Sequence, residues 1–259
     1  MVSIRRLSTI MSILVIGDSC EDYYVYGRCE RMCPDAPVPV FHRVKTITNG
    51  GMALHVSENL SALGAEVDVI SQKQRIFKTR YVDIKSNHMF LRVDSDIDPI
   101  KPIVWNNYKT VDLKAYDAII ISDYNKGFLT EKDIAHICKN HDRVFIDTKK
   151  HLGKYCENAF IIKINELEFQ TTEHTLTEKL RDKLIVTKGN QGATYKCLNF
   201  PVQDVEVKDM TGAGDTFISS LCFKFIETDD LLESIKFANK CATIVVQQRG
   251  VTIIDSDKI

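Results

Sequence analysis

The chain has 259 residues, which is enough for one large α/β core and short for two. Its 34 Lys and Arg residues nearly balance its 35 Asp and Glu residues, so a net charge of −1 offers neither a basic stripe for nucleic acid nor an acidic tail. We therefore expect no nucleic-acid partner and no membrane partner, and the 44% of hydrophobic residues fit an ordinary globular protein.

The N-terminus and the cysteines bear on where the protein resides. Segment 1–11 contains arginines but lacks the apolar stretch of an export signal, and the first apolar run, Ile13–Ile16, is only as long as a strand. The eight cysteines are scattered, and Cys29 and Cys33, the only close pair, have no second ligand pair of the kind that binds zinc. We expect reduced thiols and a cytoplasmic location.

Short apolar runs recur along the chain and are typical of buried strands, with helix-compatible patterns between several of them. The predicted strands are Ile13–Ile16, Val67–Ile70, Ala118–Ile121, Val144–Ile146, Phe160–Ile162 and Leu184–Val186. The predicted helices are Met52–Leu63, Glu131–Lys139, Ala213–Ile226 and Leu231–Val246. This alternation predicts a single α/β domain over 1–259, with a central, mostly parallel sheet flanked by helices.

Two stretches interrupt the alternation, at about residues 21–47 and 78–94. They include Tyr23–Tyr26, Val38–Val44 and Thr79–Val93, which are rich in β-branched and aromatic residues and have no helix of their own. We expect them to form a small antiparallel β lid over the carboxyl ends of the core strands, where open α/β sheets bind ligands. Two such lids would cover each other's exposed edges, which predicts a homodimer.

The most informative segment runs from Thr211 to Asp215. Gly212, Ala213 and Gly214 have little or no side chain and precede a predicted helix, so their N–H groups can surround an anion at the helix N-terminus. A carboxylate at Asp215 suits a general base beside a phosphoryl group in transfer. The alternative is an ordinary loop with a capping carboxylate. Neither a P-loop nor the His-Arg-Asp loop of protein kinases occurs.

This segment resembles the second signature of the ribokinase family, the carbohydrate kinases also named after phosphofructokinase B. Further ordered matches cover nearly the whole chain: Ile16–Asp18, Asp22–Tyr24, Arg31–Val40, Lys78–Arg80, Leu91–Asp94, Ser122–Gly127, Asp147–Lys149, Asn165–Glu168, Val186–Gly189 and Phe237–Asn239. The lid segment Arg31–Val40 is similar to a string typical of the D-glycero-D-manno-heptose-7-phosphate kinase branch, the kinase domain of a bifunctional heptose kinase/adenylyltransferase.

The resemblance implies a ribokinase-like fold and an ATP-dependent kinase with Mg²⁺ as cofactor. The implied reaction phosphorylates the anomeric C1 hydroxyl of D-glycero-D-manno-heptose 7-phosphate to the 1,7-bisphosphate. In some members of this branch a nucleotidyltransferase domain follows the kinase domain. Here we expect a separate nucleotidyltransferase to act downstream.

The resemblance also implies roles for individual residues. Asp215 would be the base, while the N–H groups of Gly212, Ala213 and Gly214 hold the developing charge. Residues implied to bind the sugar are Asp18, Asp22, Gly50, Gly51, His55, Arg80 and Lys126. Residues implied to bind the nucleotide are Lys149, Asn165, Thr187, Lys188, Gly189, Gly192 and Asn239. Asn165 and Glu168 would orient Mg²⁺ through its waters.

Several of these residue types have an equally ordinary structural role. Asp18 also fits the capping of a turn after its strand. Asn165 and Glu168 have the spacing of a helix capping box, and both roles are compatible. Lys149, Lys126 and Arg80 are candidates for either the sugar phosphate or the nucleotide phosphates, although Lys149 also fits a solvated surface lysine.

The chain departs from the family pattern at two places. After Gly50 and Gly51 the family has an asparagine that contacts sugar hydroxyls, and this chain has His55. The histidine either takes over the sugar contact or packs with both ring nitrogens satisfied, and on the first interpretation restoring asparagine preserves or raises activity. Few residues separate Ser71 from Lys78, where the family inserts a helix and a strand, which predicts a narrower sheet.

Two other functions remain compatible with the sequence. One is a kinase of the same family that acts on another sugar or sugar phosphate, because pocket contacts rather than the fold decide the substrate. The other is a non-catalytic homologue that binds a sugar or a nucleotide. The presence of Asp215 and its glycines favours catalysis.

Overall fold

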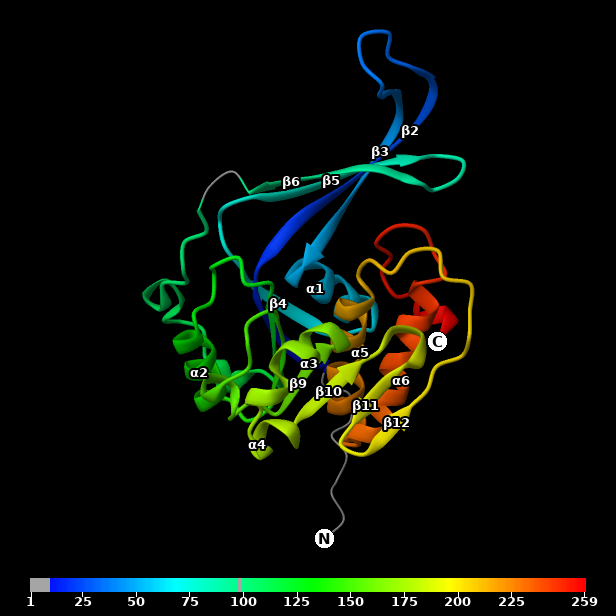
Figure 1. Ribbon diagram of the computed structural model, residues 1–259. Coiled ribbons are helices and arrows are strands. Elements are labelled where there is room, and N and C mark those ends of the chain that lie inside the picture. The colour runs from blue at the N-terminus through cyan, green and yellow to red at the C-terminus, as the bar shows by residue number, and fades with distance from the viewer. Residues whose placement is uncertain (1–9, 97–98) are drawn as a thin grey trace.

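The computed structural model describes residues 10–96 and 99–259, and Figure 1 shows how their elements are arranged. Most of the N-terminal segment discussed above lies outside these residues. An eight-stranded sheet in the order β12-β11-β10-β9-β8-β7-β1-β4 forms the centre, and a four-stranded sheet lies across one end of it.

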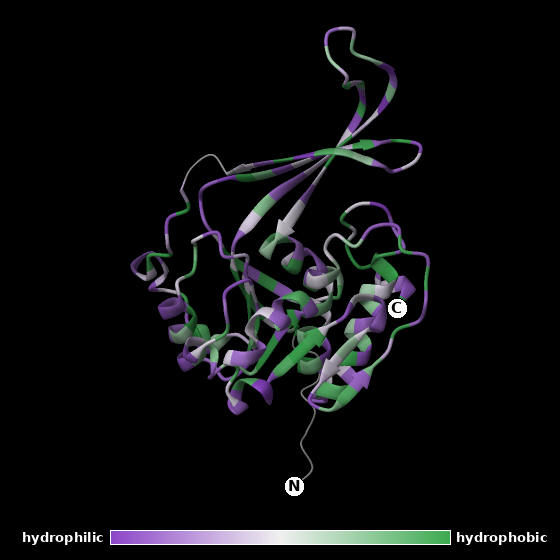
Figure 2. Cartoon of the chain, viewed as in Figure 1, coloured by the Kyte–Doolittle hydropathy of each residue, from purple (hydrophilic) through white to green (hydrophobic). Residues whose placement is uncertain are grey.

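The central sheet confirms the predicted mostly parallel arrangement. Its parallel strands are β1 (Ser12–Gly17), β4 (Glu66–Ile70), β7 (Ala118–Asp123), β8 (Val144–Thr148), β9 (Ile161–Asn165) and β10 (Leu184–Thr187). Two short strands, β11 (Ala193–Tyr195) and β12 (Leu198–Phe200), continue it antiparallel. The central strands are among the most hydrophobic parts of the chain, as Figure 2 shows, because helices cover both faces of a parallel sheet.

Helices cover the two faces of this sheet. The structure contains α1 (Ala53–Ala62), α2 (Glu131–Asn140), α3 (Glu166–Thr172), α4 (Glu178–Arg181), α5 (Ala213–Thr228) and α6 (Leu231–Val245). Short 3-10 turns occur at η1 (Trp105–Tyr108), η2 (Leu113–Ala115), η3 (Lys154–Cys156), η4 (Glu173–Thr175), η5 (Gly189–Gln191) and η6 (Ser256–Lys258). The helices expected at 52–63, 131–139, 213–226 and 231–246 are confirmed to within two residues.

Alternate residues of β1 divide the core into two clusters. Ile13 and Val15 pack with α1, α5 and α6, whereas Leu14 and Ile16 pack with residues of α2 and α4. This follows from the two-residue period of a strand, which sends successive side chains to opposite faces. The expected capping box at the start of α2 is also present, since Thr130 and Asp133 bond to each other's backbone N–H.

The lid is formed by β2 (Ser19–Met32), β3 (Pro39–Met52), β5 (Ile76–Asp83) and β6 (Met89–Asp96), in the order β3-β2-β5-β6. The expectation of a wholly antiparallel lid is wrong, because β2 and β5 pair in parallel. The chain leaves the lid after β3, passes through α1 and β4 of the core, and returns as β5. The β2–β3 hairpin projects beyond the rest of the molecule (Figure 1).

Three smaller expectations can be checked in the described residues. Only residues 71–75 lie between β4 and β5, and β4 ends the central sheet on that side, as the shortened connection predicted. All eight cysteines are free thiols. Within 10–96 and 99–259, no helix combines the length and the apolar character needed to cross a membrane.

Candidate active site

The segment predicted to be an anion cradle, Gly212 to Gly214, lies at the N-terminus of α5. Gly212 is the N-cap and has φ 84°, in the left-handed region that favours glycine. A Cβ added to Gly212 would lie 2.5 Å from Cε1 of His55, and one added to Gly214 would lie 2.8 Å from Nζ of Lys163. Gly212 therefore needs glycine, whereas a side chain at Gly214 would have to displace the end of Lys163. The first N–H groups of this helix have no partner within it, and that of Ala213 donates to the Met210 carbonyl at 3.2 Å.

Asp215 lies in the first turn of α5, and both of its carboxylate oxygens are contacted. The side chain is buried, with 5% of the residue exposed. The Tyr124 hydroxyl donates to Oδ1 at 2.8 Å, and Nδ1 of His55 lies 3.4 Å from Oδ2. Burial and the adjacent Asp215 carboxylate raise the pKa of Tyr124 well above its usual value, so the phenol stays a neutral donor.

Tyr124 was not among the predicted site residues. It lies in the family-like segment Ser122–Gly127, directly after the predicted strand Ala118–Ile121, where functional residues of parallel sheets gather. The ring also lies between two lysines: Nζ of Lys78 is 5.3 Å and Nζ of Lys149 is 5.5 Å from its centroid. Tyr124 thus contacts Lys78 of the lid, Lys149 and Asp215.

His55 lies beneath the cradle, on α1. The residue is 1% exposed, and its Nε2 lies 3.2 Å from the carbonyl oxygen of Thr252. Burial lowers the pKa of His55, but hydrogen bonding and attraction to Asp215, the Thr252 carbonyl and Glu58 outweigh it, so that the pKa lies above its ordinary value. This placement fits the second of the two interpretations given above, a packed ring with both nitrogens satisfied.

Asp22, Arg80 and Gly51 meet on the inner side of the lid. Arg80 on β5 forms a buried ion pair with Asp22 on β2, and its guanidinium lies 5.0 Å from the centroid of the Tyr24 ring. Gly51, on β3, approaches closely: a Cβ there would lie 2.5 Å from Oδ2 of Asp22. Gly50 precedes it in the same strand. The structure therefore brings the predicted sugar-binding residues of the three lid strands together.

Asp18 takes the structural role that its residue type also allowed. Its buried carboxylate accepts hydrogen bonds from the backbone N–H groups of Tyr124 at 2.8 Å, Lys126 at 3.1 Å and Phe128 at 3.4 Å. Burial raises the pKa of Asp18 although these amides oppose it. Asp18 thus fixes the loop that carries Tyr124 and Lys126, of which Lys126 was predicted to bind the substrate.

A second set of charged residues lies beside Gly214 of the cradle. Lys163 on β9 is 3% exposed, and its Nζ lies 2.7 Å from Oδ2 of Asp147 at the end of β8. Lys149 forms an ion pair with Glu168 and lies 3.6 Å from Oδ1 of Asp147. Burial opposes ionisation of Asp147, but Lys163 and Lys149 outweigh it and lower its pKa. Lys163 was not predicted as a site residue. The feature that could have indicated it is a single lysine in the apolar strand Ile161–Asn165.

Asn165 and Glu168 form the capping box that begins α3. Glu168 N–H donates to Oδ1 of Asn165 at 2.8 Å, and Asn165 N–H donates to Oε2 of Glu168 at 2.9 Å. Among the described residues no group of His, Cys, Asp and Glu side chains is arranged to hold a metal ion. Each of these two side-chain oxygens accepts one backbone N–H and can accept a further hydrogen bond, which fits contact with the waters of a Mg²⁺ that is bound chiefly by phosphates.

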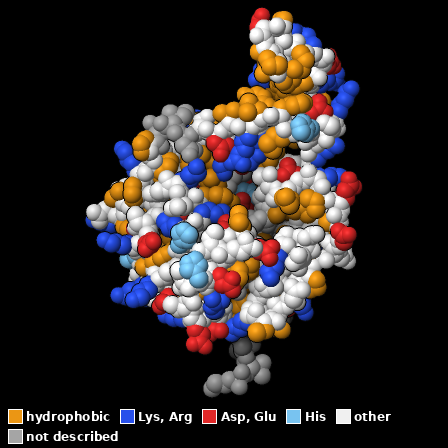
Figure 3. Space-filling model, in the orientation of Figure 1, with side chains coloured by type: hydrophobic (Ala, Val, Ile, Leu, Met, Phe, Trp, Pro, Cys, Tyr) orange, Lys and Arg blue, Asp and Glu red, His pale blue; other side chains and the backbone are white. Residues whose placement is uncertain are grey.

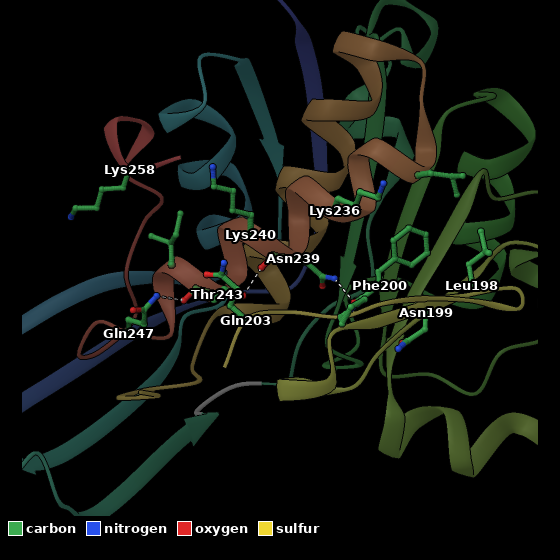
Figure 4. Close-up of a pocket in the computed structure, with 13 residues that line it drawn as sticks. Leu198, Asn199, Phe200, Gln203, Lys236, Asn239, Lys240, Thr243, Gln247 and Lys258 are labelled. Carbon is green, nitrogen blue, oxygen red and sulfur yellow. Dashed lines mark hydrogen bonds between the residues drawn. The ribbon is translucent and has the colours of Figure 1, made fainter. Parts of the chain in front are cut away.

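A pocket of about 690 Å³ lies between α6 and the chain at and after β12. Figure 4 shows Lys236, Asn239 and Thr243 on α6 facing this space, and Asn239 donates a 2.7 Å hydrogen bond to the Phe200 carbonyl. Of the predicted nucleotide residues, Asn239 lines the pocket. Thr187, Lys188, Gly189 and Gly192 lie at the end of β10 and in the turn that leads to β11.

Gly192 has no room for a side chain, because a Cβ there would lie 2.0 Å from the carbonyl oxygen of Phe200, which lines the same pocket. Space-filling atoms show the surface hollowed between the lid and the core (Figure 3). The structure thus offers a polar cleft beneath the lid and a separate pocket beside α6.

Comparisons with known proteins agree with this geometry. The model of the pfkB family carbohydrate kinases matches residues 83–258. Bifunctional protein HldE of Helicobacter pylori strain Shi470 is 32% identical, over 95% of this chain and 65% of that protein. HldE of Aliarcobacter butzleri strain RM4018 is 33% identical, over 98% and 64%. The chain thus spans about 65% of the length of these curated relatives.

Solved structures share the fold. Ribokinase of Thermotoga maritima superimposes with a TM-score of 0.68 at 16% identity, over 96% of this chain and 98% of that one. Phosphofructokinase-2 of Escherichia coli gives a TM-score of 0.70 at 13% identity, over 96% and 97%. Ribokinase of Arabidopsis thaliana, complexed with ribose and ATP, gives 0.64 at 13% identity, over 96% and 97%. With its ribokinase-like fold and a family match over more than half its length, the chain belongs to the pfkB family of carbohydrate kinases.

Proposed function

We propose that this sugar kinase uses ATP to phosphorylate the anomeric C1 hydroxyl of D-glycero-D-manno-heptose 7-phosphate, giving the 1,7-bisphosphate. The observation that carries the kinase chemistry is Asp215, which lies in the first turn of α5 beside the cradle formed by Gly212, Ala213 and Gly214. The similarity of Arg31–Val40 to the heptose-7-phosphate kinase string supports the sugar.

In the proposed reaction Asp215 takes the proton of the C1 hydroxyl, and the hydroxyl oxygen attacks the γ-phosphorus in line. The bond from that phosphorus to the bridging oxygen breaks, and ADP leaves with the electron pair. The N–H groups of the cradle stabilise charge on the transferred phosphoryl oxygens. Mg²⁺ bound with ATP would neutralise part of the phosphate charge, with Asn165 and Glu168 contacting its waters.

The nucleotide is proposed to extend from the cradle towards the pocket beside α6. Lys149 and Lys163 lie on this side of the cradle and favour phosphate binding, although both are partly neutralised by Asp147 and Glu168. Asn239 lines the pocket and holds α6 against β12. The ATP found with Arabidopsis ribokinase, which shares the fold, supports ATP as the phosphoryl donor here.

The sugar is proposed to bind beneath the lid. Asp22, together with Gly50 and Gly51, lies where hydroxyl groups would be recognised, and Arg80 and Lys126 are the proposed cations for the distal phosphate. Arg80 is paired with Asp22, and Lys149 is paired with Glu168, so either side chain would exchange a carboxylate for the phosphate on binding. A charge-assisted phosphate contact would make the unphosphorylated heptose a much poorer substrate.

A substrate panel tests this proposal. The purified protein is assayed with MgATP and heptose 7-phosphate, free heptose, fructose 6-phosphate or ribose, and ADP release and the phosphorylated product are measured. We expect the highest kcat/KM for heptose 7-phosphate. If fructose 6-phosphate or ribose reacts faster, the heptose 7-phosphate assignment is wrong and another sugar is the substrate. ATP binding without turnover on any sugar would favour a non-catalytic homologue.

A further inference from the structure

We propose that His55 is a positioning residue for Asp215 and that it acts as an imidazolium, paired with the carboxylate and placing a positive charge directly behind Gly212 of the cradle. The assignment of Asp215 as the base rests on the proposed function. The protonation state of the pair is a property of the chain alone and can be measured without any sugar.

The argument begins with the two ring nitrogens. Nε2 lies 3.2 Å from the carbonyl oxygen of Thr252, and a carbonyl can only accept a hydrogen bond, so this contact requires a proton on Nε2. Nδ1 lies 3.4 Å from Oδ2 of Asp215, which is also an acceptor when ionised. A neutral ring with its proton on Nε2 would turn the Nδ1 lone pair towards the carboxylate. A second proton on Nδ1 converts this repulsion into an ion pair.

Asn59 is the neighbour that would donate to Nε2 if the ring were neutral and carried its only proton on Nδ1. Its Oδ1 accepts the Ile254 N–H at 2.9 Å, so its Nδ2 is the end that faces His55. That Nδ2 donates to the His55 carbonyl at 2.9 Å and lies 3.1 Å from Nε2. Because Asn59 has a carbonyl acceptor of its own, it does not need the Nε2 lone pair. The Thr252 carbonyl, in contrast, gains its contact with His55 only from an Nε2 proton.

The surrounding charges favour the doubly protonated ring. Asp215 on α5 faces Nδ1, Glu58 on α1 adds a second carboxylate, and the C-terminal segment presents only the neutral Thr252 carbonyl. Tyr124, which contacts the other Asp215 oxygen, is a neutral donor. These attractions outweigh the cost of burial and raise the pKa of His55. Geometry and charge therefore indicate the same state.

The ring is placed to affect phosphoryl transfer through Asp215 and the cradle. Its Cε1 is so close to Gly212 that a Cβ there would lie 2.5 Å away, so the imidazolium lies directly against the N-cap of α5. Together with Tyr124 it holds the carboxylate at both oxygens. An asparagine at this position, the family residue, has no charge to contribute, so this proposal predicts a loss of activity in His55→Asn, in contrast to the expectation from the first interpretation of His55.

Nitrogen-15 NMR of histidine-labelled protein tests the charge directly. The His55 signals are assigned by their loss in His55→Asn, and the ring is titrated without ligands. We expect both nitrogens to stay protonated above pH 6.5, the ordinary midpoint of histidine. In Asp215→Asn we expect the midpoint to fall. A ring that is already neutral at pH 6.5, or that carries its only proton on Nδ1, would overturn the proposal.

The pH profile of turnover tests the positioning role. With MgATP and the best sugar of the panel, we expect wild-type kcat to decline at alkaline pH as His55 loses its proton, and His55→Asn to lack this limb. We expect the variant to lose about tenfold or more in kcat at neutral pH with little change in the KM for ATP. His174→Asn, at an exposed histidine, is the control. A merely structural role would lower kcat without changing the profile.

The outcomes separate this proposal from the proposed function. If heptose 7-phosphate is not a substrate but the His55 titration is as expected, the sugar assignment fails and the imidazolium stands. If the heptose is phosphorylated but His55 is neutral, or the profile of His55→Asn matches that of the wild type, the function stands and the inference about His55 fails.

Discussion

The Tyr124 hydroxyl donates a 2.8 Å hydrogen bond to Oδ1 of Asp215, which connects the loop after β7 to the first turn of α5. The same loop is held by three backbone hydrogen bonds to Asp18, at the end of β1. Asp18 therefore helps to position Asp215 indirectly, because it holds the loop whose Tyr124 donates to Asp215. Orientation of a catalytic group by such a supporting contact is what keeps it within productive distance of a substrate.

Tyr124→Phe removes this contact while keeping the ring. We expect kcat to fall by about tenfold, because a hydrogen bond to a charged acceptor contributes about 1.5–3 kcal/mol and the carboxylate loses one of its two supports. Turnover and ATP affinity are measured together, and ATP affinity should not change. Tyr116→Phe is the matched control, since that hydroxyl donates to Asp68 at 2.7 Å on the edge of the sheet. Equal losses in both variants would argue against a special role for Tyr124.

Asp215→Asn keeps the shape of the side chain but cannot accept the substrate proton. We expect turnover to fall by about a hundred- to ten-thousand-fold while ATP binding, followed by isothermal titration, survives. Asp142→Asn, at an exposed aspartate, should leave both unchanged. Retention of more than about a tenth of wild-type turnover would contradict a base of this importance.

Lys163→Met tests the buried ion pair beside the cradle. Its removal leaves Asp147 buried and without its 2.7 Å partner, so we expect a loss of about 3 kcal/mol or more in the free energy of unfolding, measured in urea. Adding Asp147→Asn should restore part of that loss, because the uncompensated charge disappears. A double variant that is less stable than Lys163→Met would show that the charge of Asp147 is not what destabilises the single variant.

The raised pKa of His55 also makes stability depend on pH. A histidine whose pKa is higher in the folded state than in the unfolded state stabilises the fold fully below the unfolded value and loses this contribution as pH rises through the folded value. We therefore expect the difference in Tm between the wild type and His55→Asn to be largest below pH 6.5 and to shrink as the pH rises above that value. A difference that grows with pH would mean that the ring is neutral in the folded protein.

The lid carries exposed apolar side chains that a second copy would cover. Leu91, for example, is 54% exposed on β6, and Met89 and Val93 of the same strand are exposed as well. We expect light scattering to show a homodimer and Leu91→Glu to shift it towards the monomer. Leu167→Glu, at a leucine that is 71% exposed on α3, should stay dimeric. A monomeric wild type at working concentrations would rule out this assembly.

Local sequence patterns predicted the core well. Apolar runs identified the parallel strands, and capping residues such as Thr130 identified helix starts, because both signals depend on residues only a few positions apart. The cradle of Gly212, Ala213 and Gly214 was also a local signal, since small residues precede an apolar helix.

Relations between distant segments were not predictable in this way. Strand patterns identify β2 and β5 as strands but do not show that they pair in parallel. The contacts of Asp215 with Tyr124 and His55 join residues 91 and 160 positions apart, and Lys163 meets Asp147 across two neighbouring strands. The part that Asp18 plays also depended on where the loop after β7 would lie.

The residues proposed to bind the sugar and those proposed for phosphoryl transfer lie in different parts of the fold. Asp22 and Arg80 belong to the four-stranded lid, where Tyr24 and Arg80 are register partners, whereas Asp215, Lys163 and Asp147 belong to the core. On the proposed function, substitutions in the lid strands would alter which sugar is accepted and leave the residues proposed for phosphoryl transfer in place. In such an architecture the acceptor can change during evolution without loss of the residues proposed to catalyse phosphoryl transfer.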